Sequence, residues 1–308
     1  MSFENIIGNE KNKFFLNRLI DSGNIVHSYM FEGIEGIGKF LFAKEFAKMI
    51  LCMGDNKKNC NICKSCIEFK SDNNPDFKII EPEGKIIKID LIRQMQEKLL
   101  EKPIISNKKV YIINDADLMT KEAQNCLLKT LEEPPNFIVI ILVLSNEGKI
   151  LNTVKSRCMR INFDVIDKQD LKKFLQQNII KNNVTDEMIE NSGGSILKLI
   201  EVNDNALIYD DILKFINMLQ ITNILDVINN AEFLYKNKDY IENILEFMEC
   251  IFYKKLINEK NNKYINVIQE LEDAKNNLRQ SCNYDMTIDH LIFKIWEEVN
   301  ENSSRNKI

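Results

Sequence analysis

In the first half of the chain, short runs of hydrophobic residues alternate with longer segments in which hydrophobic and polar positions mix. Runs of this length, bounded by polar and turn-forming residues, predict buried β-strands. Strands that alternate with helix-length segments predict a parallel α/β sheet. The expected strands are residues 28–31, 77–80, 110–113, 138–144 and 159–163.

Helices are expected between these strands, from periodicity and from end signals. Residues 40–50 carry a hydrophobic stripe at helical spacing. Asp90 can cap a second helix that runs to about residue 100, because its carboxylate can accept from the first free N–H groups. A third helix begins near Thr120 and must end before Pro134.

The last third of the chain contains no residue that commonly breaks a helix. All five prolines lie before residue 136, and all ten glycines lie at or before Gly194. Hydrophobic residues recur after that point at approximately helical spacing, so we expect a helical bundle there.

Composition limits the class of protein. A chain of 308 residues is long enough for two or three packed domains, and 44% hydrophobic with 28% charged residues is typical of globular proteins. The net charge of -5 argues against binding nucleic acid over the whole surface, although a local basic patch stays open. Residues 1–15 mix charged and apolar positions, so we expect no secretion signal there. The longest apolar run, residues 137–144, falls far below the roughly 20 residues needed to span a bilayer. We therefore expect a cytoplasmic protein that does not enter membranes.

A glycine-rich segment links the first expected strand to the first expected helix. It contains Gly33, Gly36, Gly38 and Lys39 in the order Gly-Ile-Glu-Gly-Ile-Gly-Lys. In this context the pattern predicts a phosphate-binding loop, because the glycines let backbone N–H groups curl around phosphate oxygens while the lysine adds positive charge. The alternative interpretation is a glycine-rich turn with an incidental lysine.

Both positions that usually hold magnesium beside such a loop are substituted. Phe40 stands where a serine or threonine hydroxyl would bind the ion. The strand 110–113 should lead into an acidic residue, but Asn114 follows it, before Asp115 and Asp117. Because phosphoryl transfer depends on the metal ion, we predict that the chain does not hydrolyse ATP by itself. Two alternatives stay open: an active ATPase that holds magnesium through Asp115 in an unusual way, and binding of ATP or ADP without hydrolysis.

Four cysteines crowd together after the expected first helix. Cys52, Cys60, Cys63 and Cys66 are spaced C-x7-C-x2-C-x2-C. Two residues between cysteines let their sulfurs converge on one metal, and four thiolates suit a closed, structural zinc site. An iron–sulfur cluster is the alternative, but the ferredoxin-type run continues C-x3-C-P and this one does not. We expect the other four cysteines to be small buried residues.

Several motifs together give a resemblance to a known family. They are His27-Ser-Tyr-Met-Phe-Glu-Gly33, Asn114-Asp-Ala-Asp117, the segment from Ala123 to Leu131-Glu-Glu-Pro-Pro135, Ser156-Arg157-Cys158, and the cysteine insertion. On these residues the chain resembles the AAA+ clamp-loader family, and within it the delta-prime subunits of bacterial DNA polymerase III. The likeness runs through most of the chain, although the helical last third is similar only in length and character.

This resemblance implies three domains. They are an α/β AAA+ P-loop domain at residues 1–165 with a zinc-binding insertion at 52–66, a small helical lid at 166–206, and an all-α collar at 207–308 that joins five subunits in an open ring. The implied function is to help load the sliding clamp onto primer-template DNA by scaffolding this ring. The implied partners are the gamma or tau motor subunits, the delta subunit and the clamp.

The resemblance also implies that Arg157 is an arginine finger that acts in trans on the ATP site of a neighbouring gamma or tau subunit. The chemistry is consistent, because the planar guanidinium can bind a γ-phosphate and such fingers speed hydrolysis about 10³- to 10⁵-fold. By itself, an arginine at this place is more often a solvated surface residue. Ser145-Asn146 and Lys198 match nucleotide-sensing positions of the family, which has an arginine in place of Lys198.

Overall fold

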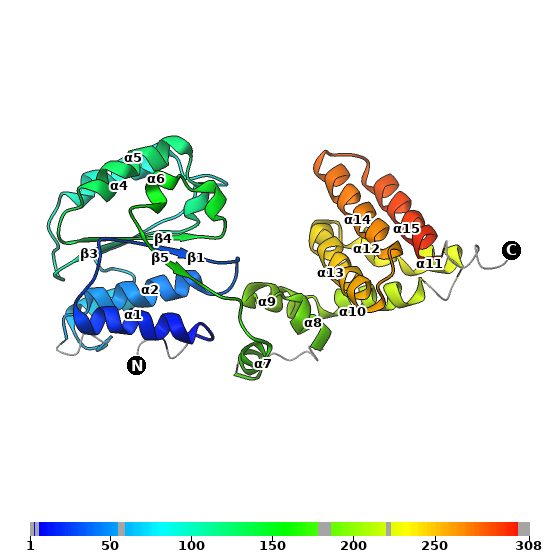
Figure 1. The fold of residues 1–308 in the computed structure, drawn as a ribbon, viewed down its shortest axis with the longest axis horizontal. Coiled ribbons are helices and arrows are strands. Elements are labelled where there is room, and N and C mark those ends of the chain that lie inside the picture. Colours follow the sequence, from blue (N-terminus) through cyan, green and yellow to red (C-terminus); the bar gives the residue numbers. More distant parts are fainter. Residues whose placement is uncertain (1–2, 4–5, 55–58, 178–185, 220–222, 301–308) are drawn as a thin grey trace. The chain divides into compact units, whose positions relative to one another are not determined.

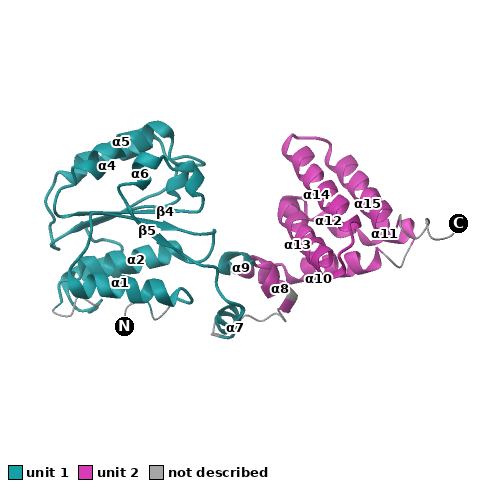
Figure 2. Cartoon of the chain, viewed as in Figure 1, with its two compact units in different colours: residues 1–179, 193–198 teal, residues 180–192, 199–308 magenta. Residues whose placement is uncertain are grey.

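The computed structural model describes residues 3, 6–54, 59–177, 186–219 and 223–300. The chain divides into two compact units (Figure 2), one of residues 1–179 and 193–198 and the other of residues 180–192 and 199–308. The first unit carries the α/β sheet and the second is helical. This twofold division is coarser than the three expected domains, whose bounds remain a prediction.

A five-stranded parallel sheet forms the centre of the first unit, in the order β2-β3-β4-β1-β5. The strands lie where the hydrophobic runs predict them, with ends that differ by one residue at most. Every residue of β4 is buried, as expected for a central strand with both faces covered. The strands are β1 (Ser28–Glu32), β2 (Phe77–Ile80), β3 (Lys109–Ile113), β4 (Ile138–Leu144) and β5 (Met159–Asn162).

Helices cover both faces of the sheet (Figure 1). On one face lie α1 (Glu10–Ser22) and α2 (Lys39–Leu51), and aromatic rings fill the layer between α2 and the sheet. The ring of Phe42 meets that of Phe163 edge to face at 4.9 Å between centroids. Such pairs stabilise the layer beyond the apolar area they bury.

On the other face lie α4 (Ile89–Leu99), α5 (Lys121–Glu132) and α6 (Asn152–Lys155), which share a buried core with the sheet. Helix α5 begins beside Thr120 as expected, and Thr120 caps it, since its side chain accepts from the N–H of Ala123 at 3.2 Å. The expected capping role of Asp90 is wrong. Helix α4 begins two residues earlier than a cap at Asp90 requires, Lys88 occupies its N-cap, and the Asp90 carboxylate lies in the first turn.

Six shorter elements complete the described part of the chain before α10. Two of them, η1 and η2, are single 3₁₀ turns that follow β3 and β4. The six elements are α3 (Lys64–Lys70), η1 (Ala116–Leu118), η2 (Glu147–Lys149), α7 (Lys168–Gln177), α8 (Asp186–Asn191) and α9 (Ile196–Asp204).

The second unit is built around one hydrophobic core, to which its helices all contribute, and this confirms the helical character expected of the last third. Among the described residues, no helix is long and apolar enough to span a membrane. The remaining elements are α10 (Ala206–Met218), α11 (Ile224–Asn230), α12 (Glu232–Lys236), η3 (Lys238–Tyr240), α13 (Ile241–Glu259), α14 (Lys263–Arg279) and α15 (Tyr284–Asn300).

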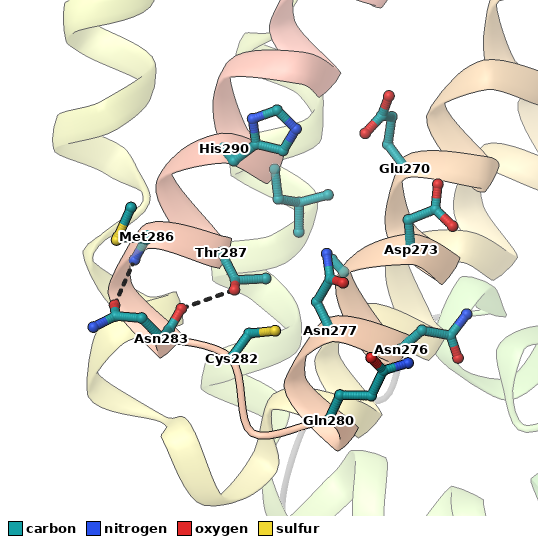
Figure 3. A pocket seen from close by; sticks show the side chains of 12 residues that line it. Glu270, Asp273, Asn276, Asn277, Gln280, Cys282, Asn283, Met286, Thr287 and His290 are labelled. Carbon is teal, nitrogen blue, oxygen red and sulfur yellow. Dashed lines mark hydrogen bonds between the residues drawn. The ribbon is translucent and has the colours of Figure 1, made fainter.

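A cavity of about 780 Å³ lies between α14 and α15 and is lined mainly by amide and acidic side chains (Figure 3). Asn283 lies at the turn between the two helices, where its Oδ1 accepts from the N–H of Met286 at 3.0 Å and so caps α15. None of the residues that line this cavity is a site residue predicted from the sequence.

Candidate functional site

The glycine-rich loop lies at the carboxyl edge of the sheet, between the end of β1 and the start of α2. Gly36 and Gly38 have φ values of 78° and 90°, a left-handed backbone that glycine adopts without strain. Gly38 is also the N-cap of α2, so Lys39 is the first residue of that helix. The strand, loop and helix thus have the arrangement of a phosphate-binding loop.

The Lys39 side chain turns into the loop instead of into solvent, and the residue is only 6% exposed. Its ammonium donates to the carbonyl oxygens of Gly33 and Ile34 at 2.8 and 2.7 Å, and to the hydroxyl of Ser145 at 3.1 Å. Burial lowers the pKa of Lys39, although the neighbouring carboxylates of Asp115 and Asp117 act in the opposite direction. The three donors of the ammonium therefore all have partners within the protein.

The acidic residues that follow β3 lie at the same edge, because parallel strands end on one side of the sheet. Asn114 donates through its amide to the Asp115 carboxylate at 3.0 Å. Burial, and secondly the charge of Asp117, raise the pKa of Asp115. Asp117 in turn accepts from the N–H of Ser145 at 3.3 Å. Both carboxylates thus have partners in the protein, and the side chain of Phe40 offers no oxygen for a magnesium ion.

The tip of the loop is covered by the start of α9. The carbonyl of Gly36 accepts from the N–H groups of Ile196 and Leu197 at 3.0 and 3.3 Å. A Cβ atom at Gly36 would stand 2.2 Å from the Oγ of Ser195, whereas one at Gly38 would meet nothing within 4 Å. Gly36 is therefore required for close packing, a role that its place in the phosphate-loop pattern did not predict.

Arg157 lies at the opposite, amino edge of the sheet. It precedes β5, whose first residue pairs with Tyr29 near the start of β1. The five residues of β1 separate this end of the sheet from the phosphate loop, a length of roughly 16 Å. The guanidinium of Arg157 and the ammonium of Lys39 therefore lie at opposite edges of one sheet.

Four residues hold Arg157 in place, namely Ser28, Thr153, Ser156 and Glu132. The hydroxyl of Ser28, a buried residue 129 positions earlier, donates to the Arg157 carbonyl at 2.6 Å. The guanidinium donates to the carbonyl of Thr153 at 2.7 Å and forms an ion pair with Glu132 at 2.7 Å. The side chain is 34% exposed, so it is held at the surface and is not free in solvent.

The four predicted cysteines come together at the end of α2 and the start of α3. Cys52 follows the last residue of α2, and Cys63 caps α3 by accepting from the N–H of Cys66 at 3.4 Å. The four sulfur atoms lie within 4.8 Å of one another. A tetrahedral Zn²⁺ with bonds of about 2.3 Å holds its sulfurs about 3.8 Å apart, so the cluster needs only a small contraction to bind one.

The surroundings of the cluster fit a metal as well. Backbone N–H groups lower the pKa of Cys60 to about 6, which favours its thiolate, while burial raises the pKa of Cys66. A Cβ at Gly54 would come within 2.9 Å of the Cys60 side chain, so the loop passes close to the sulfurs. Among the described residues, no other group of three or more histidine, cysteine or acidic side chains is close enough to hold a metal ion.

The expectation that the other four cysteines are buried is wrong. Cys250 and Cys282 are exposed, because one lies on the outer side of α13 and the other in the turn after α14. Cys126 and Cys158 are partly buried, and burial raises the pKa of Cys158 to about 11. Periodicity places a residue on a helix but does not by itself say which side meets the core.

Three residues that contact the predicted site residues were not predicted from the sequence. Ser28 and Glu132 contact Arg157, and Ser195 lies against Gly36 of the phosphate loop. Two of them lie inside motifs that identified the family, namely the segments 27–33 and 123–135. Their contacts cross between distant parts of the chain, so no local pattern could assign them.

Comparisons with known proteins agree with the motifs. A sequence model of the DNA polymerase III delta subunit family matches residues 8–167. The DNA polymerase III subunit delta' of Bacillus subtilis is 30% identical over 205 residues, which cover 66% of this chain and 61% of that protein. The subunit gamma of Buchnera aphidicola subsp. Schizaphis graminum is 26% identical over 314 residues, which cover 100% of this chain and 83% of that protein.

Other relatives are longer proteins. The subunit gamma/tau of Mycoplasma pneumoniae is 31% identical over 205 residues, which cover 67% of this chain but only 29% of that protein. Among solved structures, a gamma subunit-related protein of Thermotoga maritima is 18% identical with a TM-score of 0.48, covering 93% of this chain and 99% of that one.

Proposed function

Because this chain belongs to the DNA polymerase III delta subunit family, we propose that it is a non-hydrolysing clamp-loader subunit that presents Arg157 to a neighbouring subunit's ATP site. The observation that carries this proposal is the separation of the two edges of the sheet. Arg157 lies at the amino edge, a strand's length from the phosphate loop of its own chain. A guanidinium in that place can serve only a nucleotide bound by another molecule.

The phosphate loop also supports a subunit that does not hydrolyse ATP itself. Phe40 and Asn114 replace the usual magnesium ligands, and the Lys39 ammonium is occupied by the loop's own carbonyls. Phosphoryl transfer needs the metal ion and free positive charge at the γ-phosphate. The chain keeps the fold of the loop while the neighbour supplies the nucleotide and the magnesium.

The wider role follows from the family. We propose that the chain helps load the sliding clamp onto primer-template DNA, as a cytoplasmic scaffold in a ring with gamma or tau motor subunits and the delta subunit. The α/β domain would occupy residues 1–165, the lid 166–206 and the collar 207–308. The helical character of the second unit is consistent with a collar.

The arginine is tested in a clamp loader reconstituted with its motor subunits, clamp and primed DNA. We expect Arg157→Ala to slow hydrolysis at the adjoining ATP site by about 10³- to 10⁵-fold, seen as the loss of one fast phase in single-turnover measurements. Arg160→Ala is the matched control, because this arginine lies three residues on, is 45% exposed and pairs with Glu147.

Unchanged hydrolysis and clamp loading in Arg157→Ala would refute the arginine-finger proposal. The purified chain alone should show no magnesium-dependent ATP turnover. Turnover that disappears in Lys39→Ala would establish the alternative, an active AAA+ ATPase with unusual magnesium coordination.

For the cysteine cluster we propose a structural zinc site. All four sulfurs converge, and four thiolates leave no open coordination position for a reacting molecule. A bound ion would stabilise this short excursion by on the order of 10 kcal/mol, more than its small apolar area could supply.

Metal analysis tests this site. We expect one zinc per chain in the purified protein, and loss of that zinc together with local unfolding in Cys60→Ser. Cys282→Ser is the control, since that cysteine is exposed and lies in the second unit. Brown protein with visible absorbance and iron in place of zinc would show an iron–sulfur cluster instead.

A further inference from the structure

Glu132 is the acidic partner of Arg157, and we propose that it is a positioning residue for the arginine finger. This inference rests on the proposed function of Arg157. The carboxylate fixes where the guanidinium stands before the neighbour's nucleotide arrives, so that the finger enters the ATP site already oriented.

The geometry leaves the guanidinium both held and usable. Its Nη2 lies 2.7 Å from the Glu132 carboxylate, while its Nη1 donates to the Thr153 carbonyl at 2.7 Å and to the Ser156 hydroxyl at 3.3 Å. An arginine side chain has five N–H donors, so these partners leave donors for phosphate oxygens. Glu132 therefore need not leave for Arg157 to bind a phosphate.

The partners sit on rigid elements. Glu132 is the last residue of α5, and the chain after it is restricted by Pro134 and Pro135. Thr153 belongs to α6, and α5 packs directly against α6. The guanidinium thus spans the ends of two packed helices, which restricts the rotamers of a long side chain before it binds.

A carboxylate beside an arginine can act in two opposite ways. If it positions the guanidinium, removing its charge slows hydrolysis. If it competes with phosphate for the guanidinium, removing its charge speeds hydrolysis. The arrangement above favours positioning, because the carboxylate contacts one nitrogen and leaves other donors of the group unoccupied.

The test uses Glu132→Gln in the reconstituted clamp loader, with Glu133→Gln as the matched control. Glu133 is the adjacent exposed glutamate, and no ion pair of it is found in the described part of the chain. In single-turnover measurements, we expect the phase that Arg157→Ala abolishes to slow about 3- to 5-fold in Glu132→Gln, a size typical of a half-exposed ion pair. The ATP concentration that half-saturates this phase should not change, and Glu133→Gln should behave as the wild type.

A double-mutant cycle separates positioning from a merely structural role. In the Arg157→Ala background, Glu132→Gln should have no further effect on hydrolysis or clamp loading. An added loss in that background, an unchanged rate in the single variant, or a faster rate would each overturn the positioning role while leaving the arginine finger intact. If Arg157→Ala itself has no effect, the proposed function fails, and the positioning role fails with it.

Discussion

The two edges of the central sheet differ in how their charged side chains are held. At the carboxyl edge, the Lys39 ammonium is buried and bonded to its own loop, and the tip of that loop is packed under α9. At the amino edge, the Arg157 side chain is partly exposed and held by partners that leave some of its N–H donors free. We call the carboxyl edge the closed edge, because internal contacts occupy its charged group. We call the amino edge the open edge, because its charged group is partly exposed.

This difference shows how the residues of a phosphate-loop pattern can serve packing and internal hydrogen bonds. The Lys39 ammonium donates to the carbonyl of Gly33, and Gly36 packs closely against Ser195. These residues therefore have a role in the packing of the loop that requires no bound nucleotide. A glycine-rich motif is evidence for a backbone shape first and for chemistry second.

The strongest effect is expected at the closed edge, in Gly36→Ala. Its Cβ would stand 2.2 Å from the Ser195 Oγ and 2.6 Å from the Leu197 Cβ, on a backbone with φ of 78°. Overpacking and left-handed strain together should lower the free energy of unfolding of the first unit by about 2–4 kcal/mol. Denaturant titration followed by circular dichroism measures this loss.

Gly38→Ala is the matched control for that prediction. Its backbone is also left-handed, with φ of 90°, but an added Cβ meets nothing within 4 Å. We expect it to cost about 1–2 kcal/mol, from backbone strain alone. Equal losses in the two variants would mean that the loop is not packed under α9.

Much of this arrangement could be predicted from the sequence, and the reasons are local. The strands follow from hydrophobic runs, the loop from its glycines between a strand and a helix, and the cysteine cluster from two-residue spacings. Contacts over long separations could not be predicted in this way. Ser28 meets Arg157 across 129 residues, and only the order of strands in the sheet brings them together.

The errors have equally physical causes. Asp90 is a good capping residue, but the N-cap of α4 lies two residues earlier, at Lys88. Asp90 is therefore in the first turn, where its charge still suits the helix dipole. Cys282 is a residue type that is usually buried, but it falls in a turn at the surface of the second unit. Residue type and periodicity predict an element better than they predict its ends or its exposed side.

A smaller effect is expected at the open edge, in Ser28→Ala. This substitution leaves the partly buried Arg157 carbonyl without its 2.6 Å hydrogen bond, which should lower the free energy of unfolding by about 1–2 kcal/mol. Because the same bond fixes the backbone of the proposed arginine finger, hydrolysis by the reconstituted complex should fall as well. Ser71→Ala, at an exposed serine, should change neither quantity measurably. A stable Ser28→Ala protein with wild-type hydrolysis would show that the backbone anchor does not matter for the finger.

The least disruptive test of the open edge is the reactivity of Cys158, which follows Arg157. Burial raises the pKa of this thiol to about 11, so only about a thousandth of it is thiolate at pH 8. We expect iodoacetamide at pH 8 to modify the exposed Cys282 quickly and Cys158 slowly, with the Cys158 rate rising about tenfold per unit from pH 8 to pH 10. Peptide mapping by mass spectrometry measures both rates in one sample. If Cys158 reacts as fast as Cys282 at pH 8, the residue after Arg157 is not held in the partly buried position described above. The chain at the open edge would then not be anchored.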